Sequence, residues 1–278
     1  MVPVLCCTMT DLSPSLLIDP TRLHALLGEA RGRFDVDSIA QCESTSSSLL
    51  ERAERGAPAG SVIVADQQTA GRGSRGRSWL STPESSLTFS VLWRFERSLE
   101  HLSGLSLAVG VAVINALEAC GALGVTLKWP NDILYDDAKL GGILVEMLSE
   151  PEGALAVIGI GLNLSLPEQA WQDERFALPP AALDEILLAL PDRHALFAEL
   201  LIELAHVLDI FSGGGFAALR DQWLVHHAWQ NRRVRLQRDG RVLKEGICRG
   251  ADVDGALLLK TDDGIERCLS GDVSLRCA

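Results

Sequence analysis

The pattern of apolar residues changes at about residue 230, and this change limits the possible folds more than any other feature of the chain. Before it, helical patterns occur at residues 21–30, 49–55, 102–120 and 181–229, the last interrupted by three glycines. Apolar runs typical of buried strands lie between them, at residues 61–65, 87–95, 125–129, 142–148 and 154–162. After it come five short β runs separated by Asp-Gly turns, at residues 234–237, 242–248, 256–260, 265–269 and 273–275. The chain is therefore predicted to hold a large α+β domain followed by a small β-barrel.

Charge and cysteine content exclude several classes of protein. Over 278 residues, 25 basic and 37 acidic side chains give a formal net charge of −12, which disfavours a protein that wraps nucleic acid. The 7 cysteines form no C-x-x-C pair, which indicates free thiols in a reducing compartment. No segment reaches the roughly 20 apolar residues of a membrane span, and no secretion signal is visible. We therefore expect a cytoplasmic protein that binds neither DNA nor a membrane.

Residues 67–79, Gln-Gln-Thr-Ala-Gly-Arg-Gly-Ser-Arg-Gly-Arg-Ser-Trp, form the most unusual segment, which we call the Gly-Arg loop. Glycines let a backbone approach a ligand closely, and guanidinium groups match carboxylate and phosphate oxygens. The glycine spacing also resembles a dinucleotide-binding loop and a P-loop, but both need a helix to begin at the glycines. Residues 77–86 contain a proline and show no helical periodicity. We predict an extended ligand-binding loop between two strands; a flexible surface loop is the alternative.

Lysine is rare in this chain, so the few lysines present are candidate site residues. Lys128 opens the segment Lys-Trp-Pro-Asn-Asp at residues 128–132, and Lys139 follows shortly after it. An ammonium group can neutralise charge that develops on a phosphate. The neighbouring oxygens of Asn131 and Asp132 could hold a magnesium–phosphate group. The alternative is that both lysines only cap the ends of strands.

Five motifs, in this order, make the chain resemble the biotin–protein ligases. They are Ser44-Thr45, the Gly-Arg loop, residues 128–132, residues 139–146 (Lys-Leu-Gly-Gly-Ile-Leu-Val-Glu) and residues 159–163 (Gly-Ile-Gly-Leu-Asn). Residues 271–276, Gly-Asp-Val-Ser-Leu-Arg, are similar to the end of that family's C-terminal barrel. The resemblance covers the chain from about residue 38 onward, and residues 128–132 are its most specific part.

The resemblance implies a catalytic biotin- and ATP-binding domain at residues 38–230, with a mixed sheet and helices like those of class II aminoacyl-tRNA synthetases. An SH3-like barrel would follow at residues 231–278, and residues 1–37 would be an N-terminal extension. The implied enzyme uses ATP and Mg²⁺ to convert biotin into biotinyl-5′-AMP. It then forms an amide bond between biotin and one lysine of a biotin carboxyl carrier domain of acetyl-CoA carboxylase. No enzyme nucleophile is needed, and none of the 6 histidines lies in the matched motifs.

The resemblance also implies roles for individual residues. Arg72, Lys128 and Lys139 would be catalytic. Biotin would be bound by Ser44, Thr45, Ser46, Gln68, Arg72, Gly73, Ser74 and Lys139. ATP would be bound by Arg75, Arg77, Trp79, Lys128, Asn131, Asp132 and Asn163, with Asp132 holding Mg²⁺. Structural roles compete with three of these sites: Ser44 and Thr45 as helix caps, Trp79 in the core, and Asn163 in a turn.

Two positions depart from the family pattern, because Ser46 stands where asparagine is frequent and Ser74 where arginine is usual. About 37 residues precede the first motif, too few for the helix-turn-helix module of the family's repressor members. A ligase without a DNA-binding domain is therefore expected, with a homodimer as one possible assembly. The alternatives are a lipoate or octanoate ligase on the same fold and a non-catalytic biotin-responsive regulator.

Overall fold

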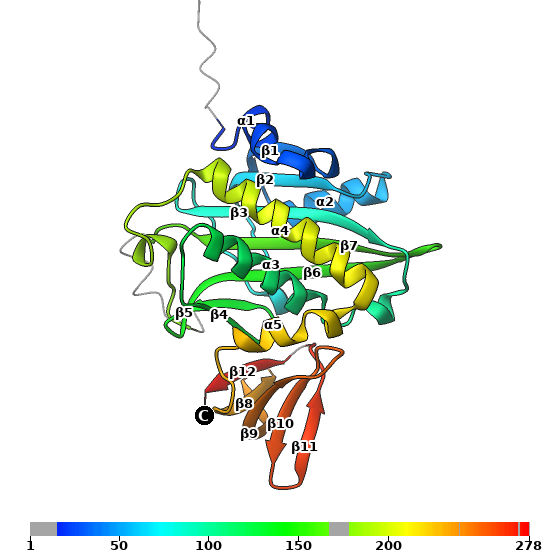
Figure 1. Ribbon diagram of the computed structural model, residues 1–278, viewed down its shortest axis with the longest axis vertical. Coiled ribbons are helices and arrows are strands. Elements are labelled where there is room, and N and C mark those ends of the chain that lie inside the picture. Colours follow the sequence, from blue (N-terminus) through cyan, green and yellow to red (C-terminus); the bar gives the residue numbers. More distant parts are fainter. Residues whose placement is uncertain (1–15, 167–177, 239, 272, 278) are drawn as a thin grey trace, which may run out of the picture.

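The computed structural model describes residues 16–166, 178–238, 240–271 and 273–277. Its larger part is a sheet with helices on both faces, and a smaller sheet lies beyond it (Figure 1). This arrangement confirms the predicted α+β class. The predicted N-terminal extension lies partly outside the described residues, as does Asp272 of the closing motif.

The large sheet has seven strands in the order β1-β2-β3-β7-β6-β5-β4. They are β1 (Asp35–Cys42), β2 (Ser61–Gln68), β3 (Ser86–Phe95), β4 (Val125–Lys128), β5 (Asp132–Tyr135), β6 (Ala138–Glu150) and β7 (Gly153–Asn163). β1 and β2 run parallel and the other neighbours antiparallel, so the sheet is mixed. Helix α2 (Thr45–Glu54) makes the crossover between the two parallel strands.

Two of these strands, β1 and β5, are missing from the sequence prediction. β1 lies at the edge of the sheet, and its inward positions include a serine, Ser38, so its apolar pattern is weak. β5 has only 4 residues, too few to show alternation, and it follows Asn131 directly. β1 was therefore not predicted because it is an edge strand, and β5 was not predicted because it is short.

Helices α3 (Leu105–Ala119) and α4 (Arg193–Gly214) pack against each other on one face of the sheet, while α2 covers part of the other face (Figure 1). α3 is apolar on almost every side because it packs on α4 as well as on β4 and β6. Helix α1 (Pro20–Leu26) packs on α4, and Ile18 and Leu23 join the main core. From residue 16 onward, the predicted extension is therefore packed into the large domain.

The segment 181–229 contains less helix than predicted. α4 begins only at Arg193, where Asp192 caps it by accepting hydrogen bonds from the backbone N–H groups of His194 (3.1 Å) and Ala195 (3.2 Å). It ends at the predicted glycine break, where Gly215 has a φ of +63°. Helix α5 (Arg220–Val225) has only 6 residues. The described 3-10 helices are Gly28–Arg33, Ser74–Gly76, Leu99–Leu102, Leu183–Glu185 and Phe216–Ala218.

The C-terminal sheet is antiparallel, with five strands in the order β11-β10-β9-β8-β12. The strands are β8 (Arg233–Arg238), β9 (Arg241–Ala251), β10 (Leu257–Thr261), β11 (Gly264–Cys268) and β12 (Ser274–Cys277). All five match predicted runs. The sheet is tied to the large domain by the Trp129 indole, which donates a buried hydrogen bond of 3.0 Å to the Gly255 carbonyl.

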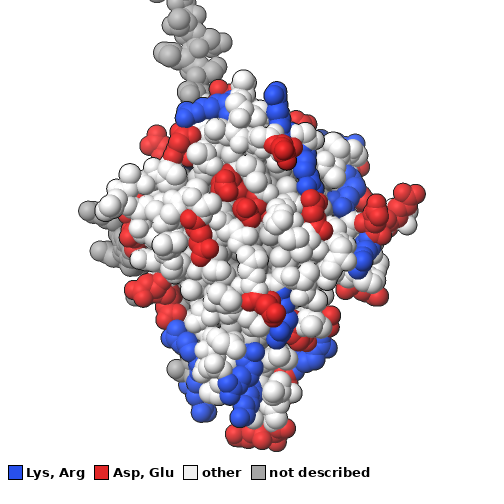
Figure 2. All heavy atoms as spheres, in the orientation of Figure 1, with Lys and Arg blue, Asp and Glu red and all other residues white. Residues whose placement is uncertain are grey.

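Basic side chains gather over the C-terminal sheet, at the lower end of Figure 2. Several of them are neutralised locally, because Glu245 pairs with both Arg233 and Arg235, and Lys244 pairs with Glu266. Within the described ranges, no helix is long and apolar enough to cross a membrane.

Candidate active site

One end of the large sheet brings the predicted motifs together. β2 ends there at Gln68 and β7 at Asn163, whose strand partner is Ser86 at the start of β3. Lys128 and Asp132 are paired across the β4–β5 turn. The start of β6, with Lys139, lies beside β5 at the same end. Motifs that are almost 100 residues apart in the sequence therefore meet at one site.

A group of buried, uncharged side chains lies where α2 begins, and we call Thr45, Ser46, Gln68 and Ser90 the uncharged cluster. The Gln68 side-chain oxygen accepts hydrogen bonds from the Thr45 backbone N–H (2.7 Å) and hydroxyl (3.1 Å). The Ser90 hydroxyl lies 2.8 Å from that of Thr45 and 3.0 Å from that of Ser46. All four residues are buried. The cluster can present directional hydrogen bonds to an uncharged polar ligand without bringing charge into the core.

Two neighbours of this cluster have structural roles. Ser44 is the N-cap of α2, where its hydroxyl accepts a hydrogen bond of 3.4 Å from the Ser47 N–H. Gly159, on β7, has no room for a side chain, because a Cβ there would lie 2.6 Å from the Ser46 hydroxyl. The helix cap considered for Ser44 is thus present in the structure.

Three charged side chains, Lys128, Asp132 and Lys139, form the charged cluster at the β4–β5 turn. One oxygen of Asp132 lies 2.5 Å from the ammonium of Lys128, and the other lies 2.5 Å from that of Lys139. Lys128 and Asp132 are almost fully buried, whereas the Lys139 side chain is 25% exposed. Two ammonium groups share one carboxylate, so the cluster carries a net positive charge toward its open side.

The environment shifts the protonation of this cluster. Burial lowers the pKa of Lys128 from 10.5 to about 8, although the Asp132 carboxylate opposes the shift. Burial alone would raise the pKa of Asp132, but the charges of and hydrogen bonds from Lys139 and Lys128 hold it well below its usual range. Asp132 therefore stays ionised, and Lys128 loses its proton at a lower pH than an ordinary lysine.

The charged cluster does not fit a magnesium ion at Asp132. Mg²⁺ needs free carboxylate oxygens, whereas both oxygens of Asp132 are occupied by ammonium groups. A dication at Asp132 would also lie against two positive charges. Among the described residues, no cluster of three or more His, Cys, Asp or Glu side chains could hold a metal ion. In this structure Asp132 is the ion-pair partner of two lysines, and a magnesium site at this residue stays a prediction.

The Gly-Arg loop folds back on itself above this site. The N–H of Gly73 donates to the Arg77 carbonyl (2.7 Å) and the N–H of Trp79 donates to the Gly71 carbonyl (2.8 Å). Arg77 in turn donates from its side chain to the carbonyl (3.2 Å) and hydroxyl (3.1 Å) of Ser74. Only a single 3-10 turn, Ser74–Gly76, follows the first two glycines, with Arg75 at a φ of +63°. The predicted lack of an α-helix here is confirmed, which removes the dinucleotide and P-loop interpretations.

Trp79 packs directly on the sheet between the loop and the charged cluster. A Cβ at Gly161 would lie only 2.4 Å from its indole ring, so β7 needs glycine there. The Lys139 ammonium lies 6.0 Å from the ring centroid. The buried Trp79 Nε1 and Asn131 Oδ1 have no hydrogen-bond partner within the described part of the chain. Buried groups of this kind are normally paired, so each of these two atoms is free to bond a ligand.

Asn163 and Arg72 contact other protein groups in this structure. The Asn163 side chain donates to the carbonyls of Lys139 (3.2 Å) and Ala181 (2.9 Å), which fixes the start of β6. Arg72 forms an ion pair of 2.6 Å with Glu146, on β6. These contacts give both residues a positioning role before any substrate binds.

Sequence reasoning missed Ser90, Glu146 and Arg276 as site residues. Ser90 lies inside an apolar strand, where a hydroxyl gives no recognisable signal. Glu146 ends a matched motif, but its partner is 74 residues away. Arg276, on β12, belongs to the closing motif. Burial and the charge of Arg77 lower the pKa of Arg276, although the Asp132 carboxylate opposes the shift. Arg276 therefore lies in the electric field of the charged cluster, although it comes from the C-terminal sheet.

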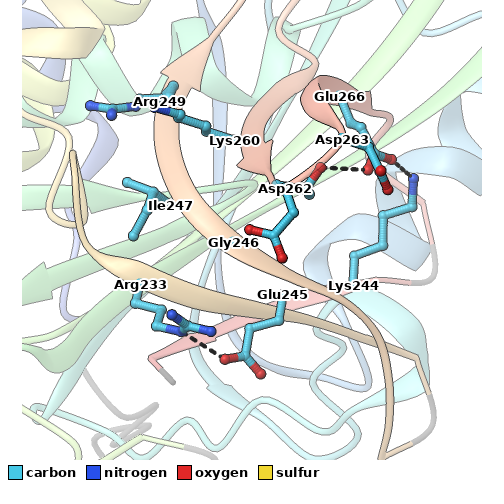
Figure 3. Close-up of a pocket in the computed structure, with 11 residues that line it drawn as sticks. Arg233, Lys244, Glu245, Gly246, Ile247, Arg249, Lys260, Asp262, Asp263 and Glu266 are labelled. Carbon is cyan, nitrogen blue, oxygen red and sulfur yellow. Dashed lines mark hydrogen bonds and ion pairs between the residues drawn. The ribbon is translucent and has the colours of Figure 1, made fainter.

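A separate hollow of about 390 Å³ lies on the C-terminal sheet (Figure 3). Ion pairs between Arg233 and Glu245 and between Lys244 and Glu266 line it. None of the predicted site residues lines it, so it is not part of the candidate active site.

The similarity to known proteins agrees with this geometry. Residues 39–163 match the Biotin/lipoate A/B protein ligase family, and residues 231–276 match the Biotin protein ligase C terminal domain. The biotin–[acetyl-CoA-carboxylase] ligase of Mycobacterium tuberculosis is 34% identical over 89% of this chain and 91% of its own length. The chain belongs to the biotin protein ligase family.

Other biotin protein ligases are similar over most of the chain. The bifunctional ligase/repressor BirA of Escherichia coli is 36% identical over 89% of this chain and 77% of its own length. The biotin protein ligase of Aquifex aeolicus, solved in complex with biotin and ATP, is 29% identical, with a TM-score of 0.74. That alignment covers 88% of this chain and 99% of the Aquifex chain.

Proposed function

We propose that this biotin protein ligase activates biotin with ATP and transfers it to a lysine of a biotin carboxyl carrier domain of acetyl-CoA carboxylase. The observation that carries the proposal is the division of one site into an uncharged cluster and a charged cluster. Biotin has an uncharged ureido ring at one end and a carboxylate at the other. The uncharged cluster suits the ring, and the charged cluster suits the carboxylate beside the phosphates of ATP.

The reaction needs orientation and charge stabilisation more than a protein nucleophile. A carboxylate oxygen of biotin attacks the α-phosphorus of ATP, and the bond to the β-phosphate breaks, which gives biotinyl-5′-AMP and pyrophosphate. The uncharged lysine amine of the carrier then attacks the biotinyl carbonyl, the bond to the phosphate breaks, and AMP leaves as the amine loses a proton. Lys139 and Arg72 would hold the carboxylate side, and Lys128 would stabilise charge that develops on the phosphate.

The remaining site residues complete this assignment. Thr45, Ser46 and Gln68 would bind the ureido ring, together with the backbone near Gly73 and Ser74. Trp79, with its unpartnered indole N–H, and Asn131 would face the nucleotide, and Arg75 and Arg77 would lie beside its phosphates. A requirement for magnesium and a homodimer both stay predictions, and no step is assigned to the metal.

A lipoate or octanoate ligase is the main rival, because the matched family at residues 39–163 includes both kinds of ligase. Two observations favour biotin: the C-terminal match is to biotin protein ligases, and a lipoyl or octanoyl tail offers no ureido group to the uncharged cluster. A regulator that binds DNA is opposed by the net charge of −12.

The decisive experiment is mass spectrometry of a purified carrier domain after incubation with the protein, ATP, magnesium and one acid. We expect a mass gain of one biotinyl group with biotin, and none with lipoate, with octanoate or without ATP. The Lys139→Ala variant is the matched control for contaminating activity. Modification by lipoate instead of biotin, or no modification by any acid, would refute the proposal.

A further inference from the structure

The Gly-Arg loop is joined to the rest of the domain by an ion pair between Arg72 and Glu146. Both terminal nitrogens of Arg72 reach Glu146: Nη2 lies 2.6 Å from Oε1 and Nη1 lies 3.3 Å from Oε2. Nη1 also donates to the Ser47 hydroxyl of α2 at 3.1 Å. One guanidinium thus connects the loop to a strand and to a helix.

Glu146 lies on the face of the sheet that carries the candidate active site. A Cβ at Gly142 would lie 3.3 Å from the Lys139 ammonium and 3.8 Å from the Trp79 ring. Glu146 is four residues further along β6, and side chains of a strand alternate between the two faces. Both positions are therefore on the same face, so Glu146 draws Arg72 across the site rather than away from it.

The internal bonds of the loop make this contact important. The N–H of Gly73 donates to the Arg77 carbonyl and the N–H of Trp79 donates to the Gly71 carbonyl, so the segment 71–79 is closed by its own hydrogen bonds. The bonds to Glu146 and Ser47 use Nη1 and Nη2 of Arg72, which leaves its Nε–H as a donor for a substrate carboxylate. Arg72 can therefore stay attached to Glu146 while it binds a ligand.

We propose that Glu146 is a positioning residue that latches the Gly-Arg loop over the site through Arg72 and so slows escape of the acyl-adenylate. The inference rests on the proposed function for its substrate, but the latch itself is a property of the free protein. Because the acyl-adenylate is a reactive anhydride, a latched loop also limits its hydrolysis.

The test compares Glu146→Gln with the matched control Glu150→Gln. Glu150 lies four residues further along the same strand, and its carboxylate forms an ion pair of 3.0 Å with Arg94. The first measurement uses free protein: trypsin cleavage after Arg75 and Arg77. We expect Glu146→Gln to be cleaved about two- to fivefold faster than wild type at low salt, and Glu150→Gln to match wild type.

The second measurement is the release of biotinyl-5′-AMP formed on the protein. Release from Glu146→Gln should be about two- to fivefold faster, and Glu146→Asp should restore part of the difference. Added salt should speed release from wild type but not from Glu146→Gln, because salt screens the ion pair. The unfolding midpoints of both variants are measured as well, so that a general loss of stability can be recognised.

Equal trypsin cleavage of Glu146→Gln and wild type would overturn the latch. Slower release of the adenylate, or a lower KM for biotin, in Glu146→Gln would also overturn it, because Glu146 would then compete with substrate for Arg72. A wild-type protein that forms no adenylate, but whose loop is still protected by Glu146, would refute the proposed function and leave the latch supported.

Discussion

The uncharged cluster and the charged cluster stabilise their buried polar groups in different ways. The uncharged cluster satisfies its buried oxygens with one another, and no net charge enters the core. The charged cluster buries an ammonium and a carboxylate, and a second, partly exposed ammonium gives it a net positive charge. Binding of a neutral group and stabilisation of a reacting anion therefore place different demands on the fold. Neutral hydrogen bonds give direction at modest cost, whereas buried charges depend strongly on every partner.

The largest effect is expected when the shared carboxylate is removed. Asp132→Ala leaves the almost fully buried ammonium of Lys128 without its partner, which should lower the free energy of unfolding by about 3–5 kcal/mol. Denaturant unfolding measures the loss. The control is Asp37→Ala, which removes a half-exposed carboxylate paired with Arg52 and should cost less than about 1 kcal/mol. Equal midpoints for the two variants would contradict the dependence of Lys128 on Asp132.

Removal of the more exposed ammonium should affect activity rather than folding. Lys139→Ala deletes a charge-assisted contact of about 1.5–3 kcal/mol, so adenylate formation should fall roughly 10- to 150-fold. Biotin-dependent exchange of pyrophosphate into ATP measures this step without the carrier. An unchanged exchange rate in well-folded Lys139→Ala would remove Lys139 from the site.

The lowered pKa of Lys128 predicts a pH dependence. Its ammonium is present below about pH 8 and is lost above it, so adenylate formation should fall by up to about tenfold per pH unit above pH 8. Folding stability depends on pH in the opposite direction to activity at this residue. Between about pH 8 and 10.5 the unfolded state binds more protons at this residue, so its contribution to stability improves as pH rises. A flat exchange rate from pH 7.5 to 9.5 would show that the reaction does not use the protonated form.

The smallest effect is expected in the uncharged cluster. Gln68→Leu removes the acceptor that serves Thr45, and a neutral hydrogen bond contributes about 0.5–1.5 kcal/mol. The KM for biotin should therefore rise about two- to tenfold, with little change in kcat at saturating biotin. A large loss of kcat with an unchanged KM would mean that this cluster belongs to the chemical step, and the contrast between the two halves would fail.

The sequence predicted which segments form the site better than it predicted what each side chain does. Glycine spacing, rare lysines and residues 128–132 were enough to locate it, because these patterns depend on short stretches of chain. The partners of Asp132 could not be inferred, because a carboxylate beside a lysine suits a metal as well as an ion pair. The strand register sets Lys139 beside β5 and so brings a second ammonium to Asp132, which the linear sequence does not show.

The same limit applies to long-range partners. Glu146 is a single acidic residue inside the predicted apolar run 142–148, and its contact with Arg72 depends on the folded position of a loop. β1 was missed because an edge strand need not alternate strongly, and its partner β2 is reached only across α2. Arg276 lies after the predicted domain boundary, and nothing in a one-dimensional pattern places it near Asp132.

The hydrogen bond between Trp129 and Gly255 affects how long the enzyme stays active on heating or storage. Trp129 directly follows Lys128, and the Lys128 ammonium lies 5.3 Å from the ring of Trp229, just before the C-terminal sheet. Local opening of that small sheet would therefore let water reach the most deeply buried charge of the site. Inactivation on heating or storage would then follow the opening of some 45 residues rather than the melting of the whole molecule. A preparation could lose its activity while its circular dichroism spectrum, dominated by the large domain, hardly changes.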